Sequence, residues 1–210
     1  MVHILRCYCL KCVNVTALTL ILIAISTSVF TSVVISEEIP LKLGRVVWGR
    51  YENPSRYKDI AYAVCGYEQW IYVVGSEGSG VGFSIPRIEK RLKHNGTMVS
   101  SWRGEGLVYG EFRDCVALNG KIYAVGYAET GNDRTWLIAV FSSDLELLNV
   151  SVRRGFRFWS EAVSIASYNG VLYVVGFRGE SPSDTVWRVE ALLPDLVVVK
   201  EYESNPSPLY

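Results

Sequence analysis

Short apolar runs, each ended by glycine, asparagine or proline, follow one another from about residue 59 towards the end of the chain. One run occurs three times with nearly the same letters, at residues 71–75 (IYVVG), 122–126 (IYAVG) and 172–176 (LYVVG). Valine, isoleucine and tyrosine favour β-strands, and a run of this length makes one strand. The copies lie about fifty residues apart, and a fixed period of that size predicts a repeat architecture.

Each repeat is predicted to contain four antiparallel strands. The first is a short run of small and medium apolar residues, which is typical of a fully buried strand. The second is the repeated run itself. The remaining strands are expected as follows: first strands at about 59–64, 111–117 and 161–166, third strands at about 83–90, 135–141 and 185–192, and fourth strands at about 98–102, 146–152 and 196–202.

The turn between the first two strands has a strong local signal in two repeats. Asn119-Gly120 and Asn169-Gly170 are expected to form two-residue hairpin turns, because both central positions of such a turn need a positive φ. The first repeat lacks this dipeptide, and a longer turn at 66–69 is expected there instead.

Four antiparallel strands in about fifty residues match one blade of a β-propeller. We therefore predict an all-β fold, a partial propeller at 37–203 with three four-stranded blades at about 59–103, 111–153 and 160–203. Residues 45–50 resemble the strand at 98–102, so one extra N-terminal strand is expected before the first blade. The tail at 204–210 contains two prolines and is expected to be disordered.

Three blades do not make a closed propeller, which needs at least about four. The open edges of the predicted sheets could pair with another chain. Three explanations are open: two copies could join as six blades in a homodimer, a separate partner chain could complete the propeller, or the reading frame could be a truncated descendant of a longer gene.

The pattern N-G-x-I/L-Y-V-V-G resembles the secreted β-propeller repeats of bacteria and archaea, over roughly residues 41–202. It is also similar to the Y-V-T-N repeats of archaeal surface-layer proteins, although Val-Gly here replaces Thr-Asn. It lacks the Gly-Gly doublet of kelch repeats and the Trp-Asp ending of WD repeats. The resemblance implies a propeller fold and says little about activity, because propellers host many unrelated functions.

Residues 13–35 form an uncharged, almost unbroken apolar run that is long enough to cross a bilayer as a helix. Arg6 and Lys11 precede the run, so a short cytoplasmic N-terminus at 1–12 is expected, with everything after residue 36 outside. Residues 13–36 are thus predicted to be a transmembrane anchor, with a cleaved signal peptide as the alternative. The protein is expected at the cell membrane, single-pass with its C-terminal domain outside, or secreted.

The five cysteines fall into two groups. Cys7, Cys9 and Cys12 precede the apolar run and are interpreted as reduced thiols at a membrane edge, with acylation as an open option, in preference to a metal site, since no second ligand pair lies nearby. Cys65 and Cys115 lie near the ends of equivalent strands in neighbouring repeats. They are interpreted as two small core residues, with a disulfide in an oxidising compartment as the alternative. No metal or other cofactor is expected.

Charge and histidine content argue against two functional classes. Lysine and arginine total 21, as do aspartate and glutamate, so no basic surplus points to nucleic acid. The two histidines are His3, before the apolar run, and His94, beside a turn, which leaves a Ser-His-Asp triad without a well-placed base. Four carboxylates lie at the starts of predicted first strands: Asp59, Glu111, Asp114 and Glu161. Capping of strand ends is favoured for them over cation binding or acid–base chemistry.

The connections between second and third strands, and those between blades, are expected to be long and to emerge on one face. Adaptable loops of this kind usually carry the binding residues. Arginines and aromatic residues on these loops are the candidate binding residues: Arg56, Tyr57, Trp102, Arg103, Arg154, Phe156, Arg157 and Trp159. Packing between blades is an equal alternative for Trp102 and Trp159. Asn95 and Asn149 lie in sequons and are candidate glycosylation sites.

The sequence therefore predicts an extracytoplasmic, membrane-tethered β-propeller module that acts by binding a protein or carbohydrate ligand, without catalysis of its own. A secreted polysaccharide-acting enzyme, or a subunit of one, is the alternative, and a truncated propeller fragment is a third possibility. A pair of loop-face carboxylates in a deep central pocket would favour the enzyme, whereas a flat face of arginine and aromatic side chains would favour binding.

Overall fold

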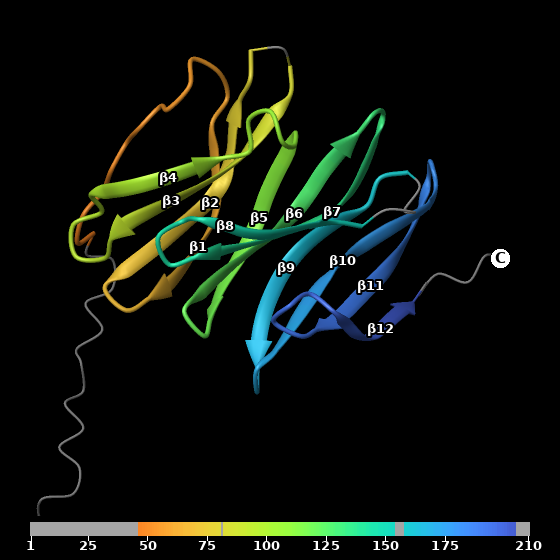
Figure 1. The fold of residues 1–210 in the computed structure, drawn as a ribbon. Coiled ribbons are helices and arrows are strands. Elements are labelled where there is room, and N and C mark those ends of the chain that lie inside the picture. Colours follow the sequence, from red (N-terminus) through yellow and green to blue (C-terminus); the bar gives the residue numbers. More distant parts are fainter. Residues whose placement is uncertain (1–45, 81, 154–157, 205–210) are drawn as a thin grey trace, which may run out of the picture. The chain divides into compact units, whose positions relative to one another are not determined.

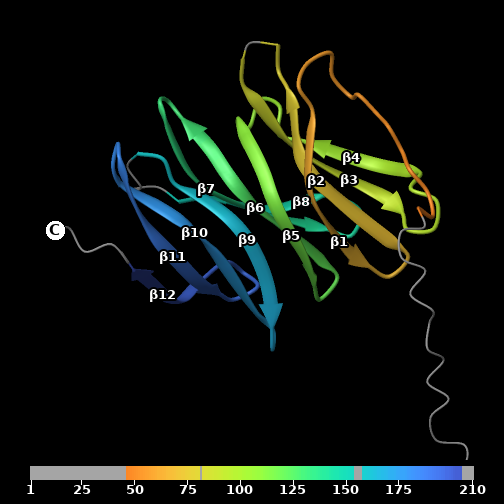
Figure 2. The same cartoon turned by 180° about the vertical axis from the view of Figure 1, so that it is seen from behind.

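The computed structural model describes residues 46–80, 82–153 and 158–204, and within them three four-stranded antiparallel sheets resemble propeller blades (Figures 1 and 2). In each sheet the chain runs up and down through four neighbouring strands. Blade 1 contains β1 (Ile60–Tyr67), β2 (Trp70–Gly78), β3 (Ser84–Leu92) and β4 (Met98–Arg103). Blade 2 contains β5 (Gly110–Leu118), β6 (Lys121–Thr130), β7 (Asp133–Ser142) and β8 (Leu147–Val152). Blade 3 contains β9 (Glu161–Tyr168), β10 (Val171–Ser181), β11 (Asp184–Leu192) and β12 (Val198–Ser204).

The hairpin turns follow the Asn-Gly signals in blades 2 and 3. Asn119 and Asn169 have φ of 52° and 50°, and the glycine after each also has a positive φ. The longer first turn expected in blade 1 is wrong, because Tyr67 pairs with Trp70 and leaves only Glu68 and Gln69 in the turn. Glu68 takes the positive φ (55°) that asparagine takes elsewhere, which is an uncommon conformation for a glutamate.

The expectation of long connections between second and third strands is wrong in blades 2 and 3. Thr130 pairs with Asp133, so two residues separate β6 from β7. Ser181 likewise pairs with Asp184 at the end of the hairpin of β10 and β11. The polar residues assigned to loops continue the strand pairing instead, because backbone hydrogen bonds do not depend on apolar side chains.

The glycine that ends each repeated run permits a β-bulge in the adjacent first strand. The pairing shifts by one residue between Ala61 and Ala63 in β1, and equivalent shifts occur in β5 and β9. A Cβ atom at Gly75, Gly126 or Gly176 would lie only 1.9–2.0 Å from a carbonyl oxygen of that first strand. The close approach of the two backbones therefore requires glycine.

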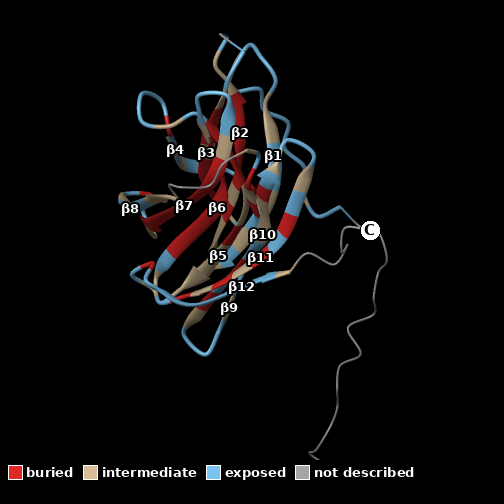
Figure 3. Cartoon of the chain, turned by 90° about the vertical axis from the view of Figure 1, so that its right-hand side faces the viewer, coloured by how far each residue is buried: buried red, intermediate tan, exposed pale blue. Residues whose placement is uncertain are grey.

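The blades stack through faces of opposite kind, with blade 2 between the other two (Figures 1 and 2). We call the face with the repeated tyrosine (Tyr72, Tyr123 or Tyr173) the back of a blade, and the opposite face the front. The back of blade 1 packs on the front of blade 2, and the back of blade 2 packs on the front of blade 3. In Figure 3 the buried residues lie mostly within the strands, and the loops at the ends of the blades are largely exposed.

Hydrogen bonds between blades repeat the same geometry. The Tyr72 hydroxyl donates to the carbonyl of Ser143 in blade 2 (2.8 Å), and the Tyr123 hydroxyl donates to the carbonyl of Pro194 in blade 3 (3.1 Å). Burial raises the pKa of Tyr72 to about 12. The phenol is protonated at neutral pH at its ordinary pKa of 10, and the shift extends its role as a donor further into the alkaline range.

Cys65 on the back of blade 1 and Cys115 on the front of blade 2 form a disulfide, with Cα atoms 5.7 Å apart. The structure thus has the bonded alternative and not two separate core thiols. At the next junction the equivalent positions are Val116 and Ile165, which belong to the apolar core between blades 2 and 3. One junction therefore has a covalent bond in addition to packing and a hydrogen bond, whereas the other has packing, hydrogen bonds and ion pairs without a disulfide at this place.

No strand is present at residues 46–50, where an extra N-terminal strand was expected. Trp48 instead donates from its indole nitrogen to the carbonyl of Lys93 (3.0 Å), and its ring fills the space beside Gly96. Glu52 pairs with Arg91 of β3 (2.6 Å). Residues 47–59 therefore lie along part of the front of blade 1 as an irregular segment.

The expected cytoplasmic N-terminus at 1–12, the anchor or signal at 13–36 and the tail at 205–210 lie outside the described residues. Ser204, assigned by sequence to the tail, instead ends β12. Within the described ranges, no helix has the length and hydropathy needed to cross a membrane.

Candidate functional site

The β-bulges place one residue of each first strand in an equivalent position. These residues are Tyr62 in β1, Arg113 in β5 and Val163 in β9, each between the two residues where the pairing shifts. A bulge breaks the normal alternation of faces and re-aims one side chain. The repeat thus presents a row of three side chains that differ in chemistry although the backbone around them is the same.

Arg113 is the centre of this row. Its guanidinium forms ion pairs with Glu111 of its own strand (2.9 Å) and with Glu161 of blade 3. The same guanidinium stacks on the Tyr62 ring of blade 1, 4.2 Å from the ring centroid. One side chain of the middle blade therefore connects all three blades at the same end of their first strands.

A second arginine extends the stack. Arg134 of β7 lies between two rings, 4.0 Å from the centroid of Tyr127 and 4.6 Å from that of Trp159. Tyr127 also faces Arg113 at 5.4 Å. Trp159 lies in the link to blade 3 and is 58% exposed. We call this continuous set the loop-end cluster: Tyr62, Glu111, Arg113, Tyr127, Arg134, Trp159 and Glu161.

Burial, together with the neighbouring carboxylate of Glu111, raises the pKa values of Tyr62 and Tyr127. Both phenols, neutral at physiological pH even at their ordinary pKa of 10, thus also resist ionisation at alkaline pH. The rings and guanidinium groups alternate as cation–π pairs; the exposed rings of Tyr62 and Trp159 offer flat apolar surface beside fixed hydrogen-bond donors, whereas Tyr127 is buried beneath them. This combination suits recognition of a polar ligand that has flat apolar surfaces.

Only part of the predicted binding set belongs to this cluster. Trp159 does. Trp102 instead packs against the rings of Phe112 and Phe141 in the core between blades 1 and 2. Arg56 and Tyr57 are exposed on the segment that precedes β1. Arg154, Phe156 and Arg157 lie outside the described residues.

The sequence analysis missed Arg113, Arg134, Tyr62 and Tyr127 as site residues. They lie within strands, whereas binding residues were expected on loops. The signal that could have found Tyr62 and Arg113 is the glycine of the repeat, because its close approach to the first strand marks where a bulge re-aims a side chain.

Two of the four carboxylates noted in the sequence bind backbone groups. Asp59 accepts hydrogen bonds from the amides of Ser55 (3.0 Å) and Gly78 (3.2 Å). Asp114 accepts from the amide of Ile165 in blade 3 (3.0 Å). Glu111 and Glu161 both pair with Arg113. Over the described residues, no group of three or more His, Cys, Asp or Glu side chains is arranged to hold a metal ion.

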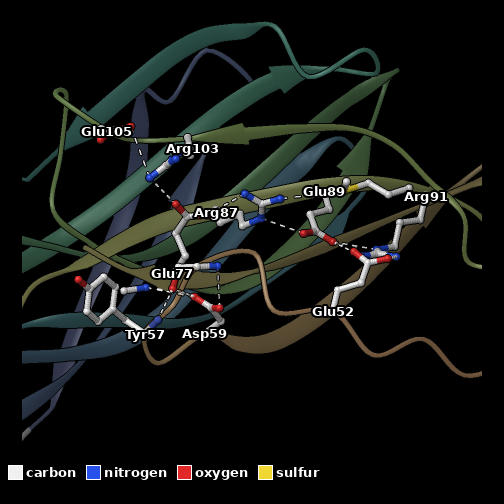
Figure 4. A network of polar contacts seen from close by, with 12 residues as sticks. Glu52, Tyr57, Asp59, Glu77, Arg87, Glu89, Arg91, Arg103 and Glu105 are labelled. Atoms are coloured by element: carbon white, nitrogen blue, oxygen red, sulfur yellow. Dashed lines mark hydrogen bonds and ion pairs between the residues drawn. The ribbon is translucent and has the colours of Figure 1, made fainter. Parts of the chain in front are cut away.

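The front of blade 1 carries a second polar feature, a chain of alternating charges along β2, β3 and β4 (Figure 4). Arg87 bonds to Glu77 (2.7 Å) and to Glu89 (2.8 Å), and Glu89 also pairs with Arg91. Arg103, a predicted binding residue, pairs with Glu77. A pocket of about 250 Å³ lies between these charges and residues 48–61. Because each charged side chain in this row has a partner of opposite charge, the pocket itself has little net charge.

The two sequon asparagines differ in exposure. Asn149 is exposed on β8, the outer strand of blade 2. Asn95 is half-buried, and its side-chain oxygen accepts from the amide of Thr97 (3.0 Å). The turn geometry thus already uses the Asn95 side chain, whereas that of Asn149 extends from an open strand.

No protein-family model matches this sequence, and no curated protein matches it either. Among solved structures, a subtype N10 neuraminidase-like protein of A/little yellow-shouldered bat/Guatemala/060/2010 is similar, with a TM-score of 0.47 and 12% sequence identity. The match covers 69% of this chain and 43% of that one, so the chain spans less than half the length of the protein it matches. The chain is assigned to no family, and its described part is an all-β protein of three blade-like sheets.

Proposed function

We propose that this protein is an extracytoplasmic, membrane-tethered, β-propeller-like module that binds a carbohydrate or protein ligand through the loop-end cluster, without catalysis of its own. The observation that carries the proposal is the continuous stack of rings and guanidinium groups from Tyr62 to Trp159 across the blades. Arginine and large aromatic residues together are the composition of binding hot spots.

The cluster is suited to binding because its geometry is fixed before a ligand arrives. Ion pairs to Glu111 and Glu161 orient Arg113, and two rings hold Arg134 between them. Side chains that are already ordered lose little conformational entropy on binding. Arg134 has no carboxylate partner within the described residues, so its guanidinium can still pair with an acidic group of the ligand.

The proposed location outside the cytoplasm is supported by the Cys65–Cys115 disulfide. Disulfides persist in oxidising compartments and are rare in a reducing cytoplasm. Residues 13–35 would provide the anchor. The location is tested by labelling thiols in intact cells with a membrane-impermeant maleimide. Labelling at positions 65 and 115 only after reductant is added outside the cells is expected, and labelling only after cell lysis would contradict it.

Binding is tested with the full-length chain in mild detergent on an array of glycans and purified surface proteins. Arg134→Ala and Trp159→Ala are each expected to weaken a detected interaction by about 30-fold, since a hot-spot side chain contributes about 2 kcal/mol. Tyr51→Ala, a change at an exposed ring outside the cluster, is the matched control. Unchanged affinity in both cluster variants would reject the site.

The same preparations test the polysaccharide-acting alternative, which would use Glu111 and Glu161. Release of reducing ends from a polysaccharide by the unaltered protein, and its loss in Glu161→Gln, would replace the binding proposal. We expect no release, because both carboxylates already pair with Arg113.

A further inference from the structure

The stacking of the blades follows one rule, in which the back of each blade covers the front of the next. Trp136 on the back of blade 2 is fully buried and donates from its indole nitrogen to the carbonyl of Phe177 in blade 3 (2.8 Å). Tyr123 and Val125 of the same face are also fully buried. Each of these three residues has an equivalent on the back of blade 3.

The back of blade 3 has the same apolar pattern but is open. Trp136 and Trp187 are equivalent because each pairs with the residue that follows the glycine of its repeat. Trp187 is 68% exposed, and Tyr173 and Val175 are more than a third exposed. Tyr168, Val189 and Ala191 continue this face along the neighbouring strands. Contiguous exposed apolar surface of this kind marks an interaction site.

The front of blade 1 is covered in part by residues 47–59 and is exposed over its first strand, and it resembles a front that another blade covers within the chain. Arg87 and Glu89 of blade 1 are equivalent to Arg188 and Glu190 of blade 3. In both blades the arginine Nε donates to the glutamate, at 2.8 and 2.9 Å. The blade 3 pair is covered by blade 2, whose Arg153 lies 3.0 Å from Glu190. In this protein, a front that carries charged side chains can therefore pack against the apolar back of another blade.

The first two strands of blade 1 also carry apolar side chains on the front. Val64 and Val73 are equivalent to Ile165 and Val174, which are packed under blade 2. Val64 is nevertheless 59% exposed. The pocket of about 250 Å³ lies over this part of the sheet and is lined by Val73, Gly75 and Ser76 among others. Ser76 occupies the position that corresponds to Phe177, whose backbone carbonyl accepts the hydrogen bond from the Trp136 indole.

We propose that the back of blade 3 docks on the front of blade 1 of a second copy of this chain. Trp187 of one copy enters the blade 1 pocket of the other, as Trp136 enters blade 3 within the chain. The two copies make this contact reciprocally, which gives a closed dimer with two identical interfaces.

The irregular N-terminal segment sets the position of the docked blade. Within the chain, tyrosine hydroxyls bind the carbonyls of Ser143 and Pro194. The equivalent carbonyl in blade 1 is that of Lys93, which already accepts from Trp48. The segment therefore covers the turn end of the front with Trp48 and reaches Gly78 at the opposite end with Asp59, and the docked face covers what remains exposed over the first two strands.

A designed disulfide tests this geometry directly. Cys65 and Cys115 join the back of one blade to the front of the next, and their equivalents at the proposed interface are Ala166 and Val64. Both residues are exposed. The full-length double variant Val64→Cys with Ala166→Cys is expected to give a covalent dimer on a non-reducing gel. Blade 2 separates the two positions within one chain, so a bond between positions 64 and 166 joins two copies.

Each single cysteine variant is the matched control, and peptide mapping identifies the bond. A covalent dimer linked between positions 64 and 166 in the double variant, and absent from both single variants, supports the proposal. A double variant that retains the native disulfide but forms no such bond overturns it.

The mass of the full-length protein in detergent, measured by light scattering after size exclusion, tests docking without added thiols. We expect a dimer for the unaltered protein and a monomer for Trp187→Glu, with at least a tenfold increase in the dissociation constant. Leu107→Glu changes a residue that is 71% exposed and lies off both faces, and it should remain dimeric. A monomeric unaltered protein, an open-ended polymer, or a Trp187→Glu dimer would each overturn the proposal.

Discussion

Trp136 and Trp187 occupy the same position in successive repeats, yet one is fully buried and the other is 68% exposed. Their strands, pairing partners and backbone environment correspond. What differs is the next sheet: blade 3 covers Trp136, and no described residue covers the equivalent surface around Trp187. In a stacked fold, the neighbouring repeat decides whether a residue belongs to the core or to the surface.

The comparison extends to the two junctions within the chain. Blades 1 and 2 are joined by Cys65–Cys115, whereas blades 2 and 3 have Val116 and Ile165 at the same place. Each junction buries a back against a front, so packing is the common element. The disulfide is an addition to the first junction, and its contribution can be measured against the second.

The largest expected effect is at Gly126, in the blade that forms both junctions. Gly126→Ala would place a Cβ atom 1.9 Å from the carbonyl oxygen of Glu111, and the bulge cannot form without a backbone shift. We expect a loss of about 4 kcal/mol or more in the free energy of unfolding, measured by urea titration and circular dichroism. Gly49→Ala has open space around its new Cβ and should be near neutral. Equal stability of the two variants would refute the close approach.

The two tryptophans provide the second test. Trp136→Ala removes a fully buried ring and a hydrogen bond between blades, and should lower the free energy of unfolding by about 3–5 kcal/mol. Trp187→Ala should change the stability of an isolated copy by less than about 1 kcal/mol and should act mainly on association. Denaturation at several protein concentrations separates these effects. A similar loss for both variants at high dilution would contradict the distinction.

The disulfide gives a third, comparable effect confined to one junction. Cys65 and Cys115 are 50 residues apart in sequence, and closing a loop of that size stabilises a fold by roughly 4 kcal/mol in the chain-entropy view. Reductant should lower the denaturation midpoint of the unaltered protein by the corresponding amount. A Cys65→Ser, Cys115→Ser variant should start at the lower midpoint and not respond to reductant; a response would point to another disulfide.

The smallest effect concerns pH and the front of blade 3. Hydrogen bonds from Arg178, and then from Arg188, lower the pKa of Glu203 from its ordinary value of 4.5 to about 2. A lowered carboxyl pKa stabilises the fold above pH 4.5, and this contribution is lost as pH falls towards 2. The free energy of unfolding should therefore fall less steeply over this window in Glu203→Gln than in the unaltered protein. The same change at exposed Glu146 is the control, and equal slopes for the unaltered protein and Glu203→Gln would reject the assignment.

The strands and their order were predictable because they follow from local patterns. The apolar repeat located the second strand of each blade. Asn119-Gly120 and Asn169-Gly170 located two hairpin turns. The strand ends were not predictable, since polar residues such as Glu129 and Arg178 continue the pairing without an apolar signal. The turn at Glu68 was missed because glutamate rarely takes a positive φ.

The candidate site was less predictable than the fold. Trp159 was found from its place in a link between blades, but Trp102 has the same composition signal and packs in the core. Arg113 and Tyr62 meet only because a bulge re-aims each of them, and their sequence positions give no reason to expect contact across about fifty residues. Contacts between repeats depend on the stacking of whole sheets, which a strand-by-strand interpretation does not contain.

The glycine that ends each repeated run has a consequence for how this gene can change. Every single-nucleotide substitution that replaces a glycine codon with another amino acid adds a Cβ atom. At Gly75, Gly126 and Gly176 that atom would lie 2.0 Å or less from a carbonyl oxygen. Mutational tolerance should therefore drop sharply at three codons spaced about fifty apart, while the bulge residues opposite them, such as Val163, can vary and give each blade its own chemistry.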